Sequence, residues 1–208
     1  MSRANVKKSS RIWLDRQNKD PFVKKSKKEG YRSRAAYKLL EIQERSKILK
    51  PGIVVVELGA APGSWSQVIM DIIAPYGKLI AVDILPIELI KSVDIIKGDF
   101  TDPVVVEQIC NLAKGRVDLI LSDVAPNLSG IWSVDIPKAM YLSEMVIEVT
   151  NKLLKKGGNL LIKLFQGEGF EKYLALLRRY FAKVIIYKPK SSRVESREIY
   201  VLAKGYYE

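Results

Sequence analysis

Residues 54–65 constrain the fold of this chain most, because an apolar strand ends at an acidic residue and passes through a glycine turn into a helix. Gly59 and Gly63 supply the turn, where a residue without a side chain lets the backbone approach a ligand closely. Open α/β sheets bind ligands in the crevice beyond the carboxyl ends of such strands. The segment therefore predicts an α/β sheet that binds a small nucleoside-like cofactor at this turn.

The spacing of the glycines indicates which cofactor to expect. Asp83 ends the next apolar strand, about 20 residues further on, where a dinucleotide-binding fold holds the ribose hydroxyls. Gly59 and Gly63 are spaced as Gly-x-x-x-Gly and not as the Gly-x-Gly-x-x-Gly that accommodates a pyrophosphate. A cofactor with a ribose but no diphosphate fits this spacing better, so we expect S-adenosylmethionine.

The rest of the chain alternates apolar strands with amphipathic helices, which predicts a mostly parallel sheet with helices on both faces. Segments 183–188 and 197–204 follow a helix around 170–177 and form a hairpin pattern, which adds one antiparallel strand near the sheet edge. The prediction is a seven-stranded Rossmann-like methyltransferase fold. The other strands are expected at 53–58, 78–83, 93–97, 117–122 and 158–165, and helices at 34–49, 64–73, 101–114 and 136–156.

Positive charge is concentrated near the N-terminus. Residues 1–50 contain 16 Lys/Arg and 5 Asp/Glu, whereas residues 51–208 contain 19 and 18. We expect a basic RNA-binding extension over 1–50, packed on a catalytic domain over 51–208. Rings interleaved with the cations favour RNA or DNA as partner over a solvated lysine-rich tail or a membrane-surface helix. These residues are Arg11, Trp13, Phe22, Tyr31, Arg32, Arg34 and Tyr37.

Composition narrows the chemistry and the compartment. The chain has no apolar run of 18 residues and no signal-peptide pattern, so we expect a cytoplasmic protein that does not enter membranes. Its one cysteine, Cys110, and its lack of histidine exclude an internal disulfide and a thiolate zinc cluster, and no metal is expected. Proton transfer must therefore use carboxylate, lysine or tyrosine side chains.

Acidic residues follow three predicted strands, at Asp83, Asp99 and Asp123. Such residues often cap the next helix, but three in succession beside a glycine turn favour a binding edge. Asp83 can accept hydrogen bonds from ribose hydroxyls and Asp99 from an adenine amino group, while Asp123 would lie nearest the reactive end. Trp65 either lines this pocket or packs beneath the helix.

Lys163 lies within the apolar strand 159–165, where an unpaired ammonium would be costly. Glu198 is its expected partner, because an antiparallel final strand begins at the edge where the parallel strands end. The pair would then lie near Asp123 and be either a structural salt bridge or a reaction centre. Lys38 is a weaker candidate, since it lies among many lysines.

Several ordered motifs resemble the FtsJ/RrmJ family of ribosomal RNA large-subunit 2′-O-ribose methyltransferases. The resemblance extends from about Trp13 to Gly205. Ser64 departs from it, because close relatives usually have glycine there, and its side chain could tighten the loop. The motifs are LGAAPGSWSQ at 58–67, SDVAPNLSG at 122–130, DIP at 135–137, KLFQGEG at 163–169, PKSSR at 189–193 and SRE at 196–198.

The resemblance implies methyl transfer from S-adenosylmethionine to the 2′-hydroxyl of a uridine in 23S rRNA, presented on an assembled or nearly assembled large subunit, by a monomer that supports ribosome assembly. Lys163 would take the hydroxyl proton or stabilise the alkoxide. Alternatives are a tRNA or another rRNA as substrate, a small-molecule methyltransferase, and a catalytically idle assembly factor. The implied tetrad is Lys38, Asp123, Lys163 and Glu198; the cofactor residues are Gly59, Gly63, Trp65, Asp83, Asp99 and Asp123.

Overall fold

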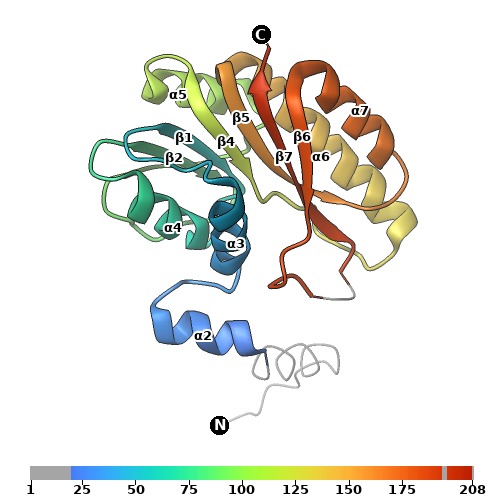
Figure 1. Ribbon diagram of the computed structural model, residues 1–208, viewed down its shortest axis with the longest axis horizontal. Coiled ribbons are helices and arrows are strands. Elements are labelled where there is room, and N and C mark those ends of the chain that lie inside the picture. Colours follow the sequence, from blue (N-terminus) through green and yellow to red (C-terminus); the bar gives the residue numbers. More distant parts are fainter. Residues whose placement is uncertain (1–19, 194–195, 208) are drawn as a thin grey trace.

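The computed structural model describes residues 20–193 and 196–207. The strands of these residues are β1 Val54–Leu58, β2 Lys78–Asp83, β3 Val93–Lys97, β4 Val117–Ser122, β5 Leu154–Phe165, β6 Phe181–Tyr187 and β7 Glu198–Tyr206. They form one sheet in the order β3-β2-β1-β4-β5-β7-β6 (Figure 1). Strands β1 to β5 are parallel, and β7 runs antiparallel to β5 and β6. The predicted fold, with its one antiparallel strand, is confirmed.

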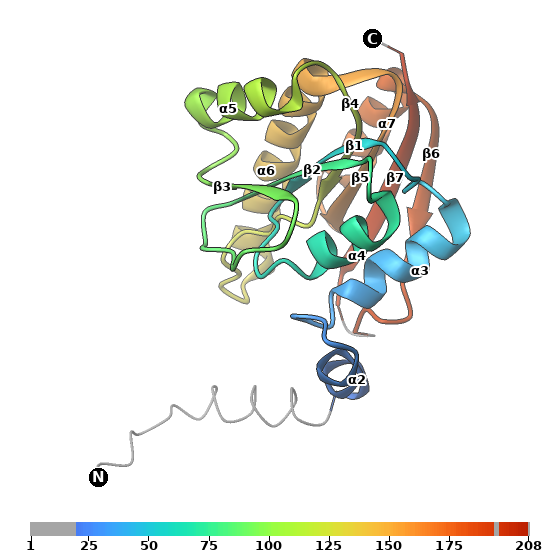
Figure 2. The ribbon, with the colours of Figure 1, turned by 90° about the vertical axis from the view of Figure 1, so that its left-hand side faces the viewer.

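Helices cover both faces of the sheet because successive strand residues point to opposite sides. Val55 belongs to a buried cluster with residues of α3 and α4, whereas Val56 belongs to a second cluster with residues of α5, α6 and α7 (Figure 2). None of the described helices is both long and apolar enough to cross a bilayer. The helices are α2 Pro21–Glu29, α3 Ala36–Ser46, α4 Ser64–Ile73, α5 Pro103–Ala113, α6 Trp132–Leu153 and α7 Phe170–Tyr180.

The junction of α6 and β5 differs from the sequence prediction. Helix α6 begins at Trp132, four residues before the predicted start, and contains Pro137. Its first turn forms because the buried Asp135 carboxylate accepts backbone N–H groups of Ser129 and Gly130, both at 2.9 Å. Strand β5 begins at Leu154 and not at 158, since an irregularity in its pairing with β4 absorbs the glycines that were expected to end the helix.

Helix α2 was not predicted, because its lysines resemble a solvated tail. Asp20 caps it by accepting the N–H groups of Phe22 and Val23 at 3.0 and 3.4 Å, with proline in the first turn, and Gly30 ends it at φ 79°. Lys24, Lys27 and Lys28 are exposed along it. Figure 1 shows α2 outside the layers of the sheet and its helices.

The aromatic residues of this region pack against one another, whereas the sequence predicted that they would stack on RNA bases. The ring of Tyr37 packs against Phe22 and Tyr31, with centroid distances of 5.5 and 5.8 Å, and only 5% of Tyr37 is exposed. These contacts hold α2 on α3. Helix α3 itself, which the sequence placed in the extension, packs on the sheet through buried residues such as Leu39. Arg11 and Trp13 lie outside the described residues.

Candidate active site

The carboxyl ends of neighbouring parallel strands bring the predicted site residues to one edge of the sheet. Leu58 of β1 is paired with Ser122 of β4, which is paired in turn with Ile162 of β5. One position further along, Asp123 therefore lies beside Lys163. This register explains why residues 40 positions apart meet.

A cavity of about 360 Å³ opens beyond the ends of β1, β2 and β4. Asp83 accepts hydrogen bonds from the backbone N–H groups of Ala61 and Leu85, both at 2.8 Å. Asp99 accepts the N–H and hydroxyl of Thr101 at 2.9 and 2.8 Å, both through Oδ1. The loops thus fix both carboxylates at the cavity wall. Other lining residues include Gly59, Val82, Phe100, Asp123, Val124 and Asn127.

Helix capping does not account for the three aspartates at the strand ends. Asp102, not Asp99, caps α5 by accepting the N–H of Val104 at 2.9 Å. Ile131 occupies the cap position of α6, eight residues after Asp123, and the residues that directly follow Asp83 are not helical. The three carboxylates therefore line the cavity without this structural function.

Gly59 is required where β1 and β4 end side by side. Its φ is 75°, a conformation that side chains rarely adopt, and a Cβ atom there would lie 2.8 Å from Val124 Cγ2 and 2.9 Å from the Val124 nitrogen. A side chain at this position would therefore push apart the two loops that form the cavity.

Gly63 and Trp65 do not line this cavity. A Cβ atom at Gly63 would lie 2.6 Å from a guanidinium nitrogen of Arg32, so this glycine makes room for an arginine of the basic region. The indole of Trp65 is 2% exposed, donates to the Ala35 carbonyl at 2.8 Å and packs on Tyr200 with a centroid distance of 5.7 Å. The structure thus replaces the pocket-lining interpretation of Trp65 with the packing alternative.

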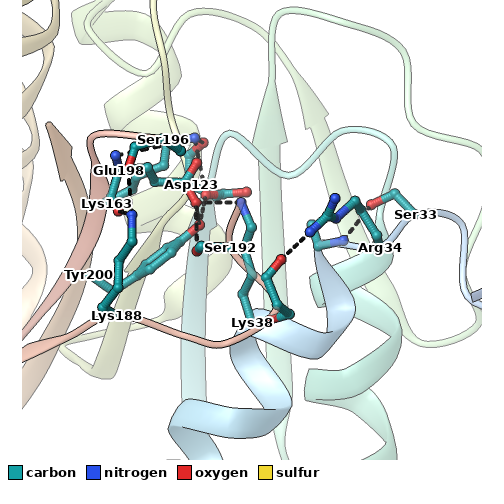
Figure 3. A network of polar contacts seen from close by, with 12 residues as sticks. Ser33, Arg34, Lys38, Asp123, Lys163, Lys188, Ser192, Ser196, Glu198 and Tyr200 are labelled. Atoms are coloured by element: carbon teal, nitrogen blue, oxygen red, sulfur yellow. Dashed lines mark hydrogen bonds and ion pairs between the residues drawn. The ribbon is translucent and has the colours of Figure 1, made fainter. Parts of the chain in front are cut away.

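Lys163 is 9% exposed and pairs with Asp123, not with Glu198 as expected (Figure 3). Its Nζ donates to the Asp123 carbonyl oxygen at 2.6 Å and lies 3.1 Å from Oδ1. The prediction was wrong because the antiparallel register sets Tyr200, not Glu198, opposite Lys163. Glu198 is two residues away, about 7 Å along the strand.

Lys38 of α3 completes a second pair, with its Nζ 2.6 Å from Oε1 of Glu198. The Tyr200 hydroxyl donates to Oδ1 of Asp123 at 2.7 Å and lies 3.4 Å from Oε1 of Glu198, so it connects the two pairs. All four residues that the resemblance implied as catalytic are thus brought together at one end of the sheet, as Figure 3 shows.

The charges around this tetrad determine the protonation states of Asp123 and Tyr200. Burial raises the pKa of Asp123, but Lys163, Lys38 and the Tyr200 hydrogen bond together lower it by more than burial raises it. The net pKa therefore lies below its usual value. Burial, then Asp123 and Glu198, raise the pKa of Tyr200 well above its usual value. Asp123 is therefore ionised at neutral pH and Tyr200 remains a hydrogen-bond donor.

Sequence reasoning missed the residues that hold the tetrad in place. Tyr200 had a detectable signal, since it lies two residues after Glu198 and so on the same face of the strand. Ser192 donates to Oε1 of Glu198 at 3.2 Å, and Lys188 donates to the Glu198 carbonyl oxygen at 2.6 Å. The last two lie in a polar loop whose path no local pattern predicts.

Ser64 and Arg32 connect the basic region to the glycine turn. The hydroxyls of Ser64 and Ser33 lie 2.8 Å apart, which supports the expected tightening of this loop. Arg32 donates to the carbonyl oxygens of Pro62 and Glu88, both at 2.9 Å. The segment between α2 and α3 is thereby attached to the loops that carry the cavity.

Comparisons with known proteins agree with this geometry. A family model described as FtsJ-like methyltransferase matches residues 31–206. The protein named ribosomal RNA large subunit methyltransferase E from Pseudomonas fluorescens strain Pf0-1 is 53% identical over 200 residues, which cover 96% of each chain. The protein of that name from Alkalilimnicola ehrlichii is 48% identical over 207 residues, 99% of each chain.

Solved structures show the same fold. A ribosomal RNA methyltransferase from Plasmodium falciparum has a TM-score of 0.78 at 29% identity, over 85% of this chain and 98% of that one. Aeropyrum pernix fibrillarin with bound S-adenosyl-L-methionine has a TM-score of 0.55 at 19% identity, over 81% and 73%, and so shows the fold alone. With a family model over most of its length and relatives at about half identity, the chain belongs to the FtsJ-like methyltransferase family.

Proposed function

We propose that this protein transfers a methyl group from S-adenosylmethionine to the 2′-hydroxyl of a uridine ribose in 23S ribosomal RNA. The observation that carries the proposal is the position of Lys163. Its ammonium is held by Asp123, and Asp123 also lines the cavity, so a buried cation lies at the rim of the cofactor site. A developing negative charge on an attacking oxygen is what such a cation stabilises.

The cavity fits the methyl donor. Two carboxylates in one nucleoside-sized cavity suit a ligand with ribose hydroxyls and an adenine amino group, and Phe100 and Val124 supply apolar walls. Asp83 accepts from the ribose, and Asp99, which uses Oδ1 for Thr101, accepts from the adenine through Oδ2. When bound, S-adenosylmethionine supplies an electrophilic methyl group on a sulfonium leaving group.

The tetrad then orients and activates the ribose hydroxyl. Lys163 contacts the 2′-oxygen: as a neutral amine it would take the hydroxyl proton and become the ammonium, and as the ammonium it would stabilise the alkoxide as charge develops. Asp123 holds Lys163 in place, and Tyr200 fixes the Asp123 carboxylate. Lys38 and Glu198 complete the charge balance, so that neither cation lies unpaired at the buried end of the sheet.

The RNA assignment rests on the relatives and on charge. Relatives about 50% identical are named ribosomal RNA large subunit methyltransferase E. The exposed lysines of α2 supply cations that phosphates attract. We place the basic extension over 1–50 and the catalytic domain over 51–208. The protein acts as a cytoplasmic monomer on an assembled or nearly assembled large subunit.

Methyl mapping tests the proposal. Large and small ribosomal subunits, tRNA and a small-molecule extract from cells that lack the gene would each be incubated with the protein and labelled cofactor, and 2′-O-methyl groups would be mapped in all RNA. We expect one new methylated uridine in 23S rRNA. Methylation of tRNA alone, or of another rRNA alone, would contradict the substrate assignment. Label found only in small molecules would indicate a small-molecule methyltransferase. No label in any fraction would indicate a catalytically idle assembly factor.

A further inference from the structure

An aromatic side chain lies exposed at the edge of the active site. Trp132, the first residue of α6, is 36% exposed, and the guanidinium of Arg197 lies 4.9 Å from the centroid of its ring. The ring of Phe165 lies at a centroid distance of 6.4 Å with an interplanar angle of 49°. A cation and a second ring thus hold the indole while part of its surface remains open to solvent.

Core packing accounts for only part of this indole. Helix α6 is anchored near its start by a buried cluster of Ile136, Ala139 and Phe165, which Trp132 touches through the Phe165 ring while remaining 36% exposed. The preceding Ile131 is also exposed, at 59%, as is Leu128 at 50%. Three large apolar residues exposed within five positions, one of them beside a guanidinium, favour a binding surface here.

The position of Trp132 relative to the tetrad limits what can occupy this surface. Phe165 follows Lys163 by two residues in β5, and it is paired with Glu198, the residue next to Arg197. The contacts of the indole are therefore made by residues at the strand ends that carry the tetrad. A molecule whose ribose reaches Lys163 would place an adjoining group near Trp132.

We infer that Trp132, held by Arg197, is a stacking platform for an unpaired RNA base next to the nucleotide that is methylated. The inference rests on the proposed RNA activity. Aromatic faces bind bases of every sequence by stacking, and an adjacent guanidinium attracts the phosphates on either side. A base inside a duplex is already stacked, so the platform selects RNA that is single-stranded beside the target ribose.

Two substitutions at this position test the inference through activity. Large subunits lacking the methylation are titrated with wild-type protein, Trp132→Ala and Trp132→Phe in single-turnover assays. We expect half-saturation for Trp132→Ala at about tenfold higher subunit concentration, a loss of about 1.4 kcal/mol, with a less than threefold change in Trp132→Phe. Cofactor affinity by calorimetry should match the wild type in both variants, and the melting temperature should match it in Trp132→Phe. Equal half-saturation in all three proteins would overturn the platform.

Fluorescence tests the platform independently of turnover. Trp65 is buried, and Trp13 is common to the wild type and Trp132→Phe, so the difference in tryptophan emission between these two proteins reports on Trp132. Single-stranded oligouridine should quench that difference signal, and a matched RNA duplex should not. If the wild type does not methylate RNA but the quenching is observed, the proposed function is overturned and the stacking platform stands. If the wild type methylates RNA but no quenching is observed, the stacking platform is overturned and the proposed function stands.

Two other results would reassign this surface. A lower melting temperature and a lower turnover number in both variants, at unchanged half-saturation, would show that Trp132 only supports α6. Self-association of the wild type that Trp132→Ala abolishes, at unchanged RNA binding, would show that the surface contacts a second copy of the chain. Either result overturns the inference.

Discussion

The cavity proposed for the cofactor and the tetrad proposed for catalysis lie at the same edge of the sheet but are built in different ways. In the cavity, Asp83 and Asp99 accept hydrogen bonds from residues a few positions along or in the adjoining glycine turn. In the tetrad, Lys38 reaches Glu198 across 160 residues and Lys163 reaches Asp123 across 40. Nearby turns therefore fix the carboxylates of the cavity, whereas the pairs of the tetrad depend on the topology and register of the whole sheet.

This difference determines how each region should respond to substitution. A cavity residue mainly serves a ligand, so its loss should weaken binding and leave the fold intact. A tetrad residue also neutralises a buried charge, so its loss leaves the partner uncompensated. The substitutions below separate the two regions, beginning with the largest expected effect.

Replacing Lys163 should have the largest effect on catalysis. Lys163→Ala removes the cation at the cavity rim, and we expect the turnover number to fall at least about 100-fold, while cofactor and RNA affinities remain within a few fold. Rapid-quench assays with labelled cofactor measure the turnover and calorimetry the affinities. Wild-type turnover in Lys163→Ala would remove this residue from the mechanism.

Lys163→Arg separates the two possible roles of the lysine. Arginine keeps the positive charge but does not give up its proton at accessible pH. Substantial residual turnover would favour stabilisation of the alkoxide, and turnover as low as that of Lys163→Ala would favour proton abstraction.

Glu57 lies between the two regions and should give the largest effect on stability. Burial raises the pKa of this carboxyl to about 8, the Ser66 hydroxyl opposes the shift, and Asp123 and Asp83 add to it. A raised folded-state pKa contributes stability below the unfolded value, and this is lost as pH rises from about 4.5 to about 8. Glutamine does not titrate, so the free energy of unfolding of Glu57→Gln should fall less over this pH interval than that of the wild type. The expected difference is roughly a few kcal/mol.

Urea unfolding between pH 5 and pH 8 measures this difference. Ser66→Ala is a matched control, since loss of its hydrogen bond should move the loss of stability to higher pH. Parallel pH profiles for Glu57→Gln and the wild type would show that Glu57 is ionised in the folded protein.

For the same reason, the strand-end carboxylates of the cavity could be predicted from the sequence better than the pairing within the tetrad, although Gly63 and Trp65, which were also predicted as cofactor residues, do not line the cavity. Gly59 and the strand-end aspartates are visible as a strand, a turn and an acid in adjoining positions, so local patterns were enough. The partner of Lys163 depends on which residue the antiparallel register sets opposite it, and a shift of two residues exchanges Glu198 for Tyr200. Membership of the tetrad came from resemblance, and its pairing came only from the structure.

Substitution of the cavity carboxylates should affect binding alone. Asp83→Ala and Asp99→Ala remove the proposed acceptors for ribose and adenine, and we expect each to weaken cofactor affinity about tenfold, the effect of about 1.4 kcal/mol. Asp99→Asn is a matched control, because its amide oxygen still accepts from Thr101 while its other oxygen is lost. Unchanged calorimetric affinity in both alanine variants would reject this cofactor site.

Neutralising exposed lysines should weaken RNA binding without affecting either region. Replacing Lys24, Lys27 and Lys28 with glutamine should reduce the slope of log RNA affinity against log salt concentration. The reduction should correspond to up to about three lost phosphate contacts, because exposed cations act through counterion release. Lys25→Gln is the matched control, since Lys25 lies 3.8 Å from Glu29 and over the Tyr37 ring. An unaltered salt slope in the triple variant would locate the RNA contacts elsewhere.

The smallest effect is expected at Ser64, where the basic region joins the glycine turn. Ser64→Gly removes the contact with the Ser33 hydroxyl but leaves Arg32 bound to Pro62, so the loop keeps one of its two attachments. We expect the free energy of unfolding to fall by about 1 kcal/mol, since a neutral hydrogen bond contributes about that much. Cofactor affinity should change less than threefold. Arg32→Lys, which cannot span both loops with a planar fork, should weaken cofactor binding more. If Ser64→Gly proves the more damaging of the two, the hydroxyl pair and not the guanidinium holds the cavity loop.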